Sequence, residues 1–263
     1  MIVKPIHHAK KTSLAVTQSV FIGRSLRHSL RNAEAMLMAI LLPVLLMLLF
    51  TYVFGGAIDS SGDYVNYVVP GIILLCAGFG SSSVAVDVAQ DMTNGIIDRF
   101  RTMPIRSVSV ITGHVVASLV RNLLATGVVL GVALLVGFKP SGGVLDWVFA
   151  LGLIALFILA FTWLFAAIGM VAGSPAAAGS YGFALLFLPY LSSAFVKTDT
   201  MPEWLQWIAS NQPITPVIES IRGLLMGASI REFIGWAIGW CLLILLVSLL
   251  WGMWSFRRRA GRR

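Results

Sequence analysis

The sequence predicts an all-α polytopic membrane protein. Of its residues, 58% are hydrophobic and only 11% are charged, and the mean hydropathy of the chain is +0.89. Soluble domains carry roughly 25% charged residues. Apolar runs of about 20 residues, the length that crosses a hydrocarbon core as a helix, recur along the chain. Cys76 and Cys241 lie inside such runs and indicate neither a disulfide nor a metal framework.

Six predicted spans form the core of a single transmembrane domain over residues 1–263. A basic segment, 1–34, precedes the core at 35–256, and a basic tail, 257–263, follows it. Within 1–34, Ile22, Leu26 and Leu30 recur every four residues beside several arginines, which predicts a helix lying in the cytoplasmic headgroup layer. The predicted spans are 35–57, 68–89, 118–138, 144–172, 178–196 and 232–256.

The distribution of positive charge predicts the orientation. Fourteen of the 19 lysines and arginines fall in 1–34, in the loop 90–107 and in the tail. Cytoplasmic segments carry the excess of these residues. We therefore expect both termini and the loop 90–107 on the cytoplasmic side of a bacterial plasma membrane.

The loop 90–107 is the most polar interruption of the core. Ile96, Phe100 and Met103 recur at helical spacing, and Pro104 ends the helix because it lacks an N–H. A short amphipathic helix between two spans is what a membrane protein offers to a soluble partner. The alternative is a solvated loop whose apolar residues rest on the bilayer. The candidate contact residues are Asp91, Gly95, Ile96, Asp98, Arg99, Phe100, Met103, Pro104 and Arg106.

The outer segment 197–231 is too apolar for an ordinary loop and too short for a pair of spans. Thr200 before Pro202, and Thr215 before Pro216, predict two helix starts, and Gly227 predicts the end of the second helix. The spacing predicts a re-entrant hairpin, or two helices lying flat in the aromatic belt. Glu219 and Arg222, three residues apart, can pair. The candidate outer-gate residues are Pro202, Trp204, Trp207, Pro213, Glu219 and Arg222.

Two charges interrupt the predicted spans near their cytoplasmic ends. Asp87 and Arg121 are each the lone charge of a span, and a lone charge in hydrocarbon is costly. We expect them to pair, and structural pairing is favoured over a direct role in transport.

Two separated motifs resemble the type 2 ATP-binding-cassette exporter permeases, most of all the daunorubicin/doxorubicin-resistance branch. The run 198–225, which begins Thr-Asp-Thr-Met-Pro-Glu-Trp and ends Arg-Gly-Leu-Leu, is similar to the family's outer motif. The run 91–106, with Gly95, Asp98-Arg99-Phe100 and a Thr-Met-Pro close, resembles its cytoplasmic loop. Gln90 and Thr93 are neutral where the family has a denser acidic cluster.

The resemblance implies a permease subunit whose energy comes from another chain. The sequence has no Gly-x-x-x-x-Gly-Lys-Ser/Thr loop to hold phosphate, so we expect no ATPase activity in this chain. The resemblance implies a separate ATP-binding-cassette ATPase that uses ATP and Mg, and a second permease, identical or paralogous. It implies membrane lipid but no nucleic acid as a partner, and no cofactor or metal bound by this chain.

The function that the resemblance implies is export of an amphipathic small molecule or drug. Export of a lipid or lipid-linked glycan through the same architecture is the alternative within transport. A non-transporting signalling subunit of an ATPase complex is the alternative from another class. ATP-driven movement of a compound across vesicles separates transport from signalling.

Overall fold

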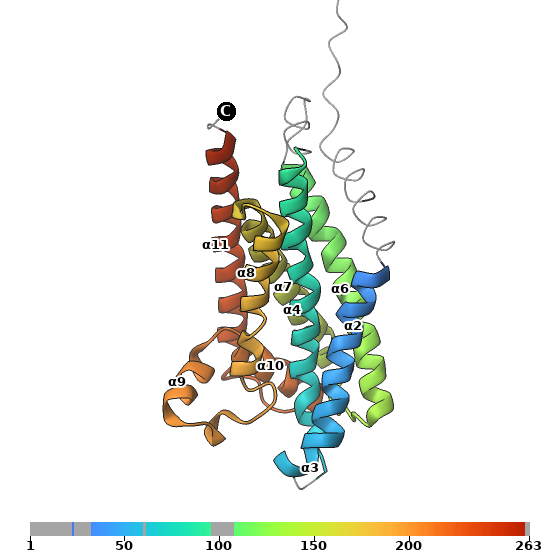
Figure 1. The fold of residues 1–263 in the computed structure, drawn as a ribbon. Helices are drawn as coiled ribbons and strands as arrows, with labels where there is room; N and C mark the ends of the chain where they lie inside the picture. The colour runs from blue at the N-terminus through green and yellow to red at the C-terminus, as the bar shows by residue number, and fades with distance from the viewer. Residues whose placement is uncertain (1–22, 24–32, 60–61, 96–107, 261–263) are drawn as a thin grey trace, which may run out of the picture.

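The structure is a bundle of helices whose long members run alongside one another (Figure 1). This computed structural model describes residues 23, 33–59, 62–95 and 108–260. Every regular element in that part of the chain is helical, as the composition predicts. The long helices are α2 (Ala33–Leu48), α4 (Tyr64–Thr93), α6 (Val108–Val136), α7 (Val144–Val171) and α11 (Ile234–Ala260).

The two ends of the bundle are named here after the ends of α4. The last turns of α4 and α11 and the first turns of α6 lie at the Thr93 end (Figure 1). The first turns of α4 and α7 lie at the Tyr64 end, together with two short helices, α9 (Glu203–Asn211) and α10 (Ile214–Met226). The helix ends that flank the loop 90–107 and the helix that leads into the tail thus lie at one end.

α4 is the central helix. In the most apolar window of α4, 72% of the residues are buried, against 11% in that of the span Met36–Ile58, which includes most of α2. Its backbone touches that of α7, because a Cβ on Gly169 would lie 2.4 Å from the carbonyl oxygen of Ala85. The peripheral helices instead expose apolar side chains, such as Leu37 on α2 and Leu250 on α11, which suit contact with lipid.

α2 ends in an irregular stretch at the Tyr64 end. A π-helical segment, η1 (Leu49–Phe54), follows α2 directly and leads into the short α3 (Gly55–Ile58). Phe50 in η1 stacks on Phe195, with ring centres 4.3 Å apart. The first predicted span therefore packs against the end of the fifth predicted span.

The fifth predicted span, 178–196, is where the structure departs from the sequence prediction. α8 (Pro175–Leu185) has 11 residues, and a 3-10 turn, η2 (Leu188–Leu191), follows it after a break. Pro189 has no N–H for a helical hydrogen bond, and its carbonyl oxygen accepts from the Ser192 hydroxyl at 2.5 Å. Among the described residues, five helices are long and apolar enough to cross a membrane, where the sequence predicted six.

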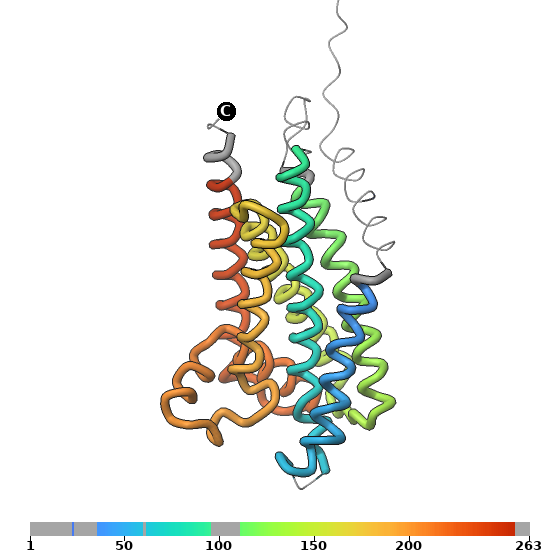
Figure 2. Tube along the Cα trace, in the orientation of Figure 1, coloured from blue at the N-terminus to red at the C-terminus, as the bar shows by residue number. Residues whose placement is uncertain are grey.

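This broken segment still accompanies α4 along most of its length (Figure 2). Near the start of the segment, a Cβ on Gly179 would contact Val86 on α4. Near its end, the Tyr64 hydroxyl donates to the carbonyl oxygen of Phe195 at 2.8 Å. Residues 64 to 86 of a helix extend about 33 Å, so the segment runs the depth of the bundle without being one continuous helix.

The two short helices of the predicted outer segment are present, but neither begins at its predicted threonine: α10 already starts at Ile214, so Thr215 lies within its first turn. Thr200 does not cap α9: it lies in the 3-10 turn η3 (Thr198–Thr200), and its hydroxyl donates to the carbonyl oxygen of Lys197 at 2.7 Å. α9 begins after Pro202 instead. α10 ends at Gly227, whose φ of 67° is the left-handed conformation that glycine adopts readily.

Some predictions fall outside the described residues. These are the interfacial helix within 1–34 and the loop helix from Ile96 to Met103. The predicted tail is partly covered, since α11 continues to Ala260.

Candidate functional site

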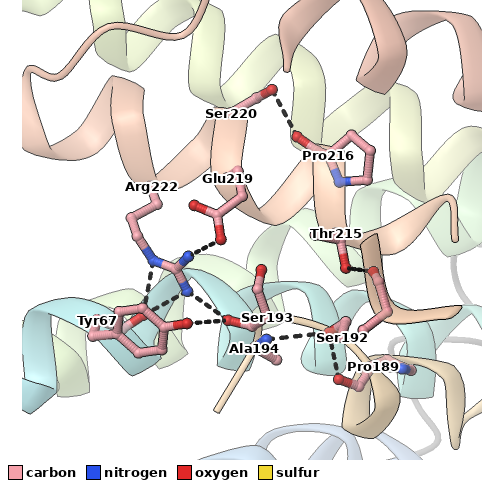
Figure 3. Close-up of polar contacts among 11 residues, drawn as sticks. Tyr67, Pro189, Ser192, Ser193, Ala194, Thr215, Pro216, Glu219, Ser220 and Arg222 are labelled. Carbon is pink, nitrogen blue, oxygen red and sulfur yellow. Dashed lines mark hydrogen bonds and ion pairs between the residues drawn. The ribbon is translucent and has the colours of Figure 1, made fainter. Parts of the chain in front are cut away.

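Arg222 fastens α10 to α4 at the Tyr64 end (Figure 3). Its Nε and Nη2 donate to the carbonyl oxygen of Tyr67 at 3.2 and 3.0 Å, and Nη2 also donates to the carbonyl oxygen of Ser193 at 2.8 Å. The Tyr67 hydroxyl donates to the same Ser193 oxygen at 2.9 Å. Nη1 forms the ion pair with Glu219 that the spacing predicts, and the guanidinium carbon lies 3.8 Å from the Tyr67 ring centre. This arrangement, the Arg222 clamp, joins α10, α4 and the segment after η2.

The loop between α6 and α7 holds the C-terminal end of α10. The backbone N–H groups of Ser141 and Gly142 both donate to the carbonyl oxygen of Leu225 at 3.0 Å, and the Ser141 hydroxyl donates to that of Met226 at 2.7 Å. A Cβ on Gly142 would lie 2.2 Å from the carbonyl oxygen of Leu224, so this approach requires glycine. The last carbonyl groups of a helix need such donors because they have no partner within it.

α10 is therefore part of the bundle core. Ile218 and Ile221 are fully buried, and the helix packs against α4, α7 and α11. α9 differs, since Trp204 and Trp207 are 70% and 72% exposed. Pro202 and Pro213 stand immediately before α9 and α10. The six predicted outer residues thus divide between the exposed α9 and the clamped α10 and do not converge on one site.

A cluster of buried polar side chains joins α4, α6 and α7 in the middle of the bundle. Asn122 Nδ2 donates to Ser81 Oγ at 3.3 Å and to Ser118 Oγ at 3.2 Å, and the Thr162 hydroxyl donates to Ser81 Oγ at 3.1 Å. A Cβ on Gly80 would lie 1.4 Å from Asn122 Oδ1, so the amide occupies space that only glycine leaves open. Such interhelical bonds stabilise membrane helices by about 0.6–2 kcal/mol each. This cluster was not predicted from the sequence, because its members are single small polar residues within apolar runs.

The predicted pair Asp87 and Arg121 lies between two of these helices, α4 and α6, nearer the Thr93 end. The Arg121 guanidinium is buried, and its Nη2 donates to the carbonyl oxygen of Gly80 at 3.0 Å and to the Ser83 hydroxyl. Asp87, one turn beyond Ser83 on α4, acts electrostatically on the guanidinium. The structure thus gives Arg121 acceptors that the sequence did not indicate, and its direct pairing with Asp87 stays a prediction.

The helices that lead into and out of the loop 90–107 are tied together. Asp91 lies in the last turn of α4, and its Oδ2 is 2.8 Å from Nε2 of His114 on α6. The contact is a hydrogen bond or, with a protonated imidazole, an ion pair. Asn94 donates its N–H to the carbonyl oxygen of Gln90, and Gly95 follows with a φ of 67°. These contacts mark where α4 ends and the loop begins. Of the nine predicted contact residues, Asp91 and Gly95 are described, and the others lie outside the described part of the chain.

The comparison with protein families identifies the class of this bundle. The model of the ABC-2 type transporter family matches residues 19–226, which is most of the chain. The chain belongs to the ABC-2 type transporter family.

Two curated permeases show where in this family the similarity lies. The chain is 31% identical over 185 residues to the daunorubicin resistance ABC transporter permease protein DrrB1 of Streptomyces coeruleorubidus, a match that covers 70% of this chain and 65% of that protein. It is 25% identical over 178 residues to the probable doxorubicin resistance ABC transporter permease protein DrrC of Mycobacterium tuberculosis, covering 66% and 64%. The chain thus spans just under two-thirds of the length of these relatives. The matches confirm the resemblance carried by the two motifs.

Membership in a permease family agrees with the chemistry of the ABC-2 chain. Within residues 33–59, 62–95 and 108–260, no group of three or more His, Cys, Asp or Glu side chains is placed to hold a metal ion. The full sequence contains no phosphate-binding loop. The curated relatives that the chain matches are permease proteins, in agreement with the two motifs.

Proposed function

We propose that this ABC-2 permease is the transmembrane half of an ATP-driven exporter for an amphipathic small molecule. Its relatives are named for resistance to daunorubicin or doxorubicin, which supports a drug-like cargo. A second permease, identical or paralogous, completes the pathway, and two separate ATPase subunits bind ATP and Mg. We place the Thr93 end in the cytoplasm, because the loop 90–107 and the basic tail extend from helices that meet there.

The six-span topology is part of this proposal. The segment from Pro175 to Phe195 runs beside α4 from Val86 to Tyr64, which supports a crossing by a broken helix. Broken helices are tolerated at membrane depth where protein satisfies their backbone groups. The Ser192 hydroxyl, which donates to one backbone carbonyl and accepts from the Ala194 N–H at 3.1 Å, does this here.

The observation that carries the proposal is the continuity of α4 between two fastened ends. α4 has 30 residues and therefore extends about 45 Å. At the Thr93 end, Asp91 ties it to His114 beside the loop that we assign to ATPase contact. At the Tyr64 end, the Arg222 clamp ties it to α10. A push on the loop would tilt α4 and carry α10 with it.

In this mechanism α10 closes the outer end of the pathway, and ATP binding to the partner subunits moves it. The helix is re-entrant: it is buried in the bundle yet has only 13 residues, too few to cross a membrane. The carbonyl groups of Leu225 and Met226 accept hydrogen bonds from the α6–α7 loop, so the C-terminal end of the helix has backbone partners when it lies below the membrane surface.

Transport into inside-out vesicles tests the proposal. The chain is expressed with an ATP-binding-cassette ATPase from the same genome, and uptake of fluorescent doxorubicin is followed after ATP is added. The control carries an ATPase whose phosphate-binding lysine is replaced. ATP-dependent uptake supports the drug-exporter assignment.

Two other outcomes would contradict it in different ways. ATP-driven translocation of a fluorescent phospholipid, without uptake of doxorubicin, would favour the lipid-exporting alternative. ATP hydrolysis that depends on the permease but moves neither compound would favour a signalling subunit.

A further inference from the structure

We propose that α9 is a membrane anchor that rests on the outer-leaflet lipids through Trp204, Trp207 and Ile208. This inference requires that the chain lies in a membrane with its Tyr64 end outside. It does not depend on the cargo or on the ATPase.

The two faces of α9 differ in exposure. Toward the bundle, Ala209 is fully buried and Leu205 is half-buried. On another face, Trp204 and Trp207 are 70% and 72% exposed, and Ile208 is 41% exposed. Residues three and four apart share one side of a helix, so these three side chains form one largely apolar surface, called here the indole face, with the exposed Asn211 at its C-terminal end. The indole face is directed away from the protein.

Polar contacts fix the orientation of α9. Gln206 Nε2 donates to the carbonyl oxygens of Asp199 at 3.1 Å and Met201 at 2.8 Å, just before the helix. The Thr215 hydroxyl of α10 donates to the carbonyl oxygen of Ala209 at 2.5 Å. Figure 1 shows α9 at the side of the bundle, at the Tyr64 end. The direction of the indole face is thus set by the fold.

Aromatic residues mark the level of the membrane interface at this end. Trp147 lies in the first turn of α7, where it is half-buried, and Trp236 lies in that of α11, where it is 69% exposed. Tryptophan and tyrosine concentrate at the membrane–water boundary because their rings are apolar and their N–H or O–H groups are polar. α9 lies at the same end of the bundle, so its indoles reach the same layer.

The chemistry of the indole face favours lipid over a second protein. Two tryptophan side chains at this exposure present roughly 200–350 Å² of accessible surface. A specific protein interface needs about 800 Å² from each partner. α9 contains no lysine or arginine, and its acid, Glu203, is at the N-terminal end. The anchor should therefore depend on the indoles and not on the charge of the lipid headgroup.

Spin-label accessibility tests the anchor in the intact chain in phosphatidylcholine nanodiscs. The buried Cys76 and Cys241 are replaced by alanine, and a nitroxide is attached after Trp207→Cys, Ile208→Cys or Ser210→Cys. Ser210 is exposed and lies two residues from Ile208, on the opposite side of α9, so it is the matched control for position 208. We expect labels at 207 and 208 to collide more with oxygen, which concentrates in lipid, than with a water-soluble nickel complex. The label at 210 should show the reverse.

Ile208→Cys keeps both indoles, so this variant reports even where Trp207→Cys fails to fold. Nickel accessibility at 208 equal to that at 210 would place the face in water and overturn the proposal. Protection of 208 from both reagents would place it against protein, such as a second copy, and overturn it too. Adding phosphatidylglycerol should leave the accessibilities unchanged, and a shift deeper into the bilayer would contradict docking by the indoles alone.

Discussion

Replacing Arg222 by methionine should destabilise the protein by about 2–4 kcal/mol. Methionine keeps an unbranched apolar stem but removes the donors to the carbonyl oxygens of Tyr67 and Ser193 and the cation beside Glu219. Hydrogen bonds to a charged group stabilise by about 1.5–3 kcal/mol each, and breaking a fully buried ion pair costs about 3–5 kcal/mol. The side chains of Arg222 and Glu219 are 13% and 24% exposed, so water replaces part of the loss.

The melting temperature of the detergent-purified chain, followed by the fluorescence of a fused reporter during size-exclusion chromatography, measures this loss. For a chain of this length each kcal/mol shifts the melting temperature by about 2–4 °C, so we expect a fall of roughly 5–15 °C. Glu219→Gln is the control: it keeps the bonds from Arg222 to the two carbonyl oxygens and should cost less than about 1 kcal/mol. Equal melting temperatures for Arg222→Met and wild type would refute the clamp.

Three further predictions concern the loop and the middle of the bundle. Phe100→Asp should leave the permease in the membrane but reduce co-purification of the ATPase, because it puts an unpaired charge into the proposed apolar contact; undiminished co-purification would contradict this. Arg121→Ala should reduce the amount of folded protein more by itself than together with Asp87→Ala, and strictly additive losses would show that the two charges do not meet. Gly80→Ala should lower the melting temperature because its Cβ would lie 1.4 Å from Asn122 Oδ1, and adding Asn122→Ala should recover part of that loss; no recovery would rule out this clash as the cause.

The long helices could be predicted from the sequence because a helix that crosses a bilayer requires a long run of consecutive apolar residues. Local spacing likewise predicts the Glu219–Arg222 pair and the end of α10 at Gly227, since both depend on residues within one or two turns. The break in the fifth segment is less visible. Its hydropathy is continuous, and Pro189 alone does not decide between a kink and an interruption.

Contacts between residues far apart in the chain could not be predicted from the sequence. His114 meets Asp91 across 23 positions, and Arg222 meets the Tyr67 carbonyl oxygen across 155. Every residue type carries a backbone carbonyl group, so the sequence cannot show which carbonyl oxygen will accept a hydrogen bond. The spacing therefore pointed to Arg222 but not to the segments that its side chain joins. The exposure of α9 and the burial of α10 are equally long-range, because both arise from which helices pack beside them.

The central claim is that α4 and α10 move as one body between the loop and the outer end. The distance between spin labels after Gln90→Cys, at the Thr93 end, and Ser229→Cys, just after α10, tests it directly. Both positions are exposed. The labelled chain, in the Cys76→Ala and Cys241→Ala background and diluted with unlabelled chain, is assembled with its ATPase in nanodiscs and measured by pulsed electron resonance. We predict the same mean distance within the chain with and without bound ATP, and a broader distribution after Arg222→Met. A mean distance that changes on ATP binding in the otherwise wild-type chain would contradict the account.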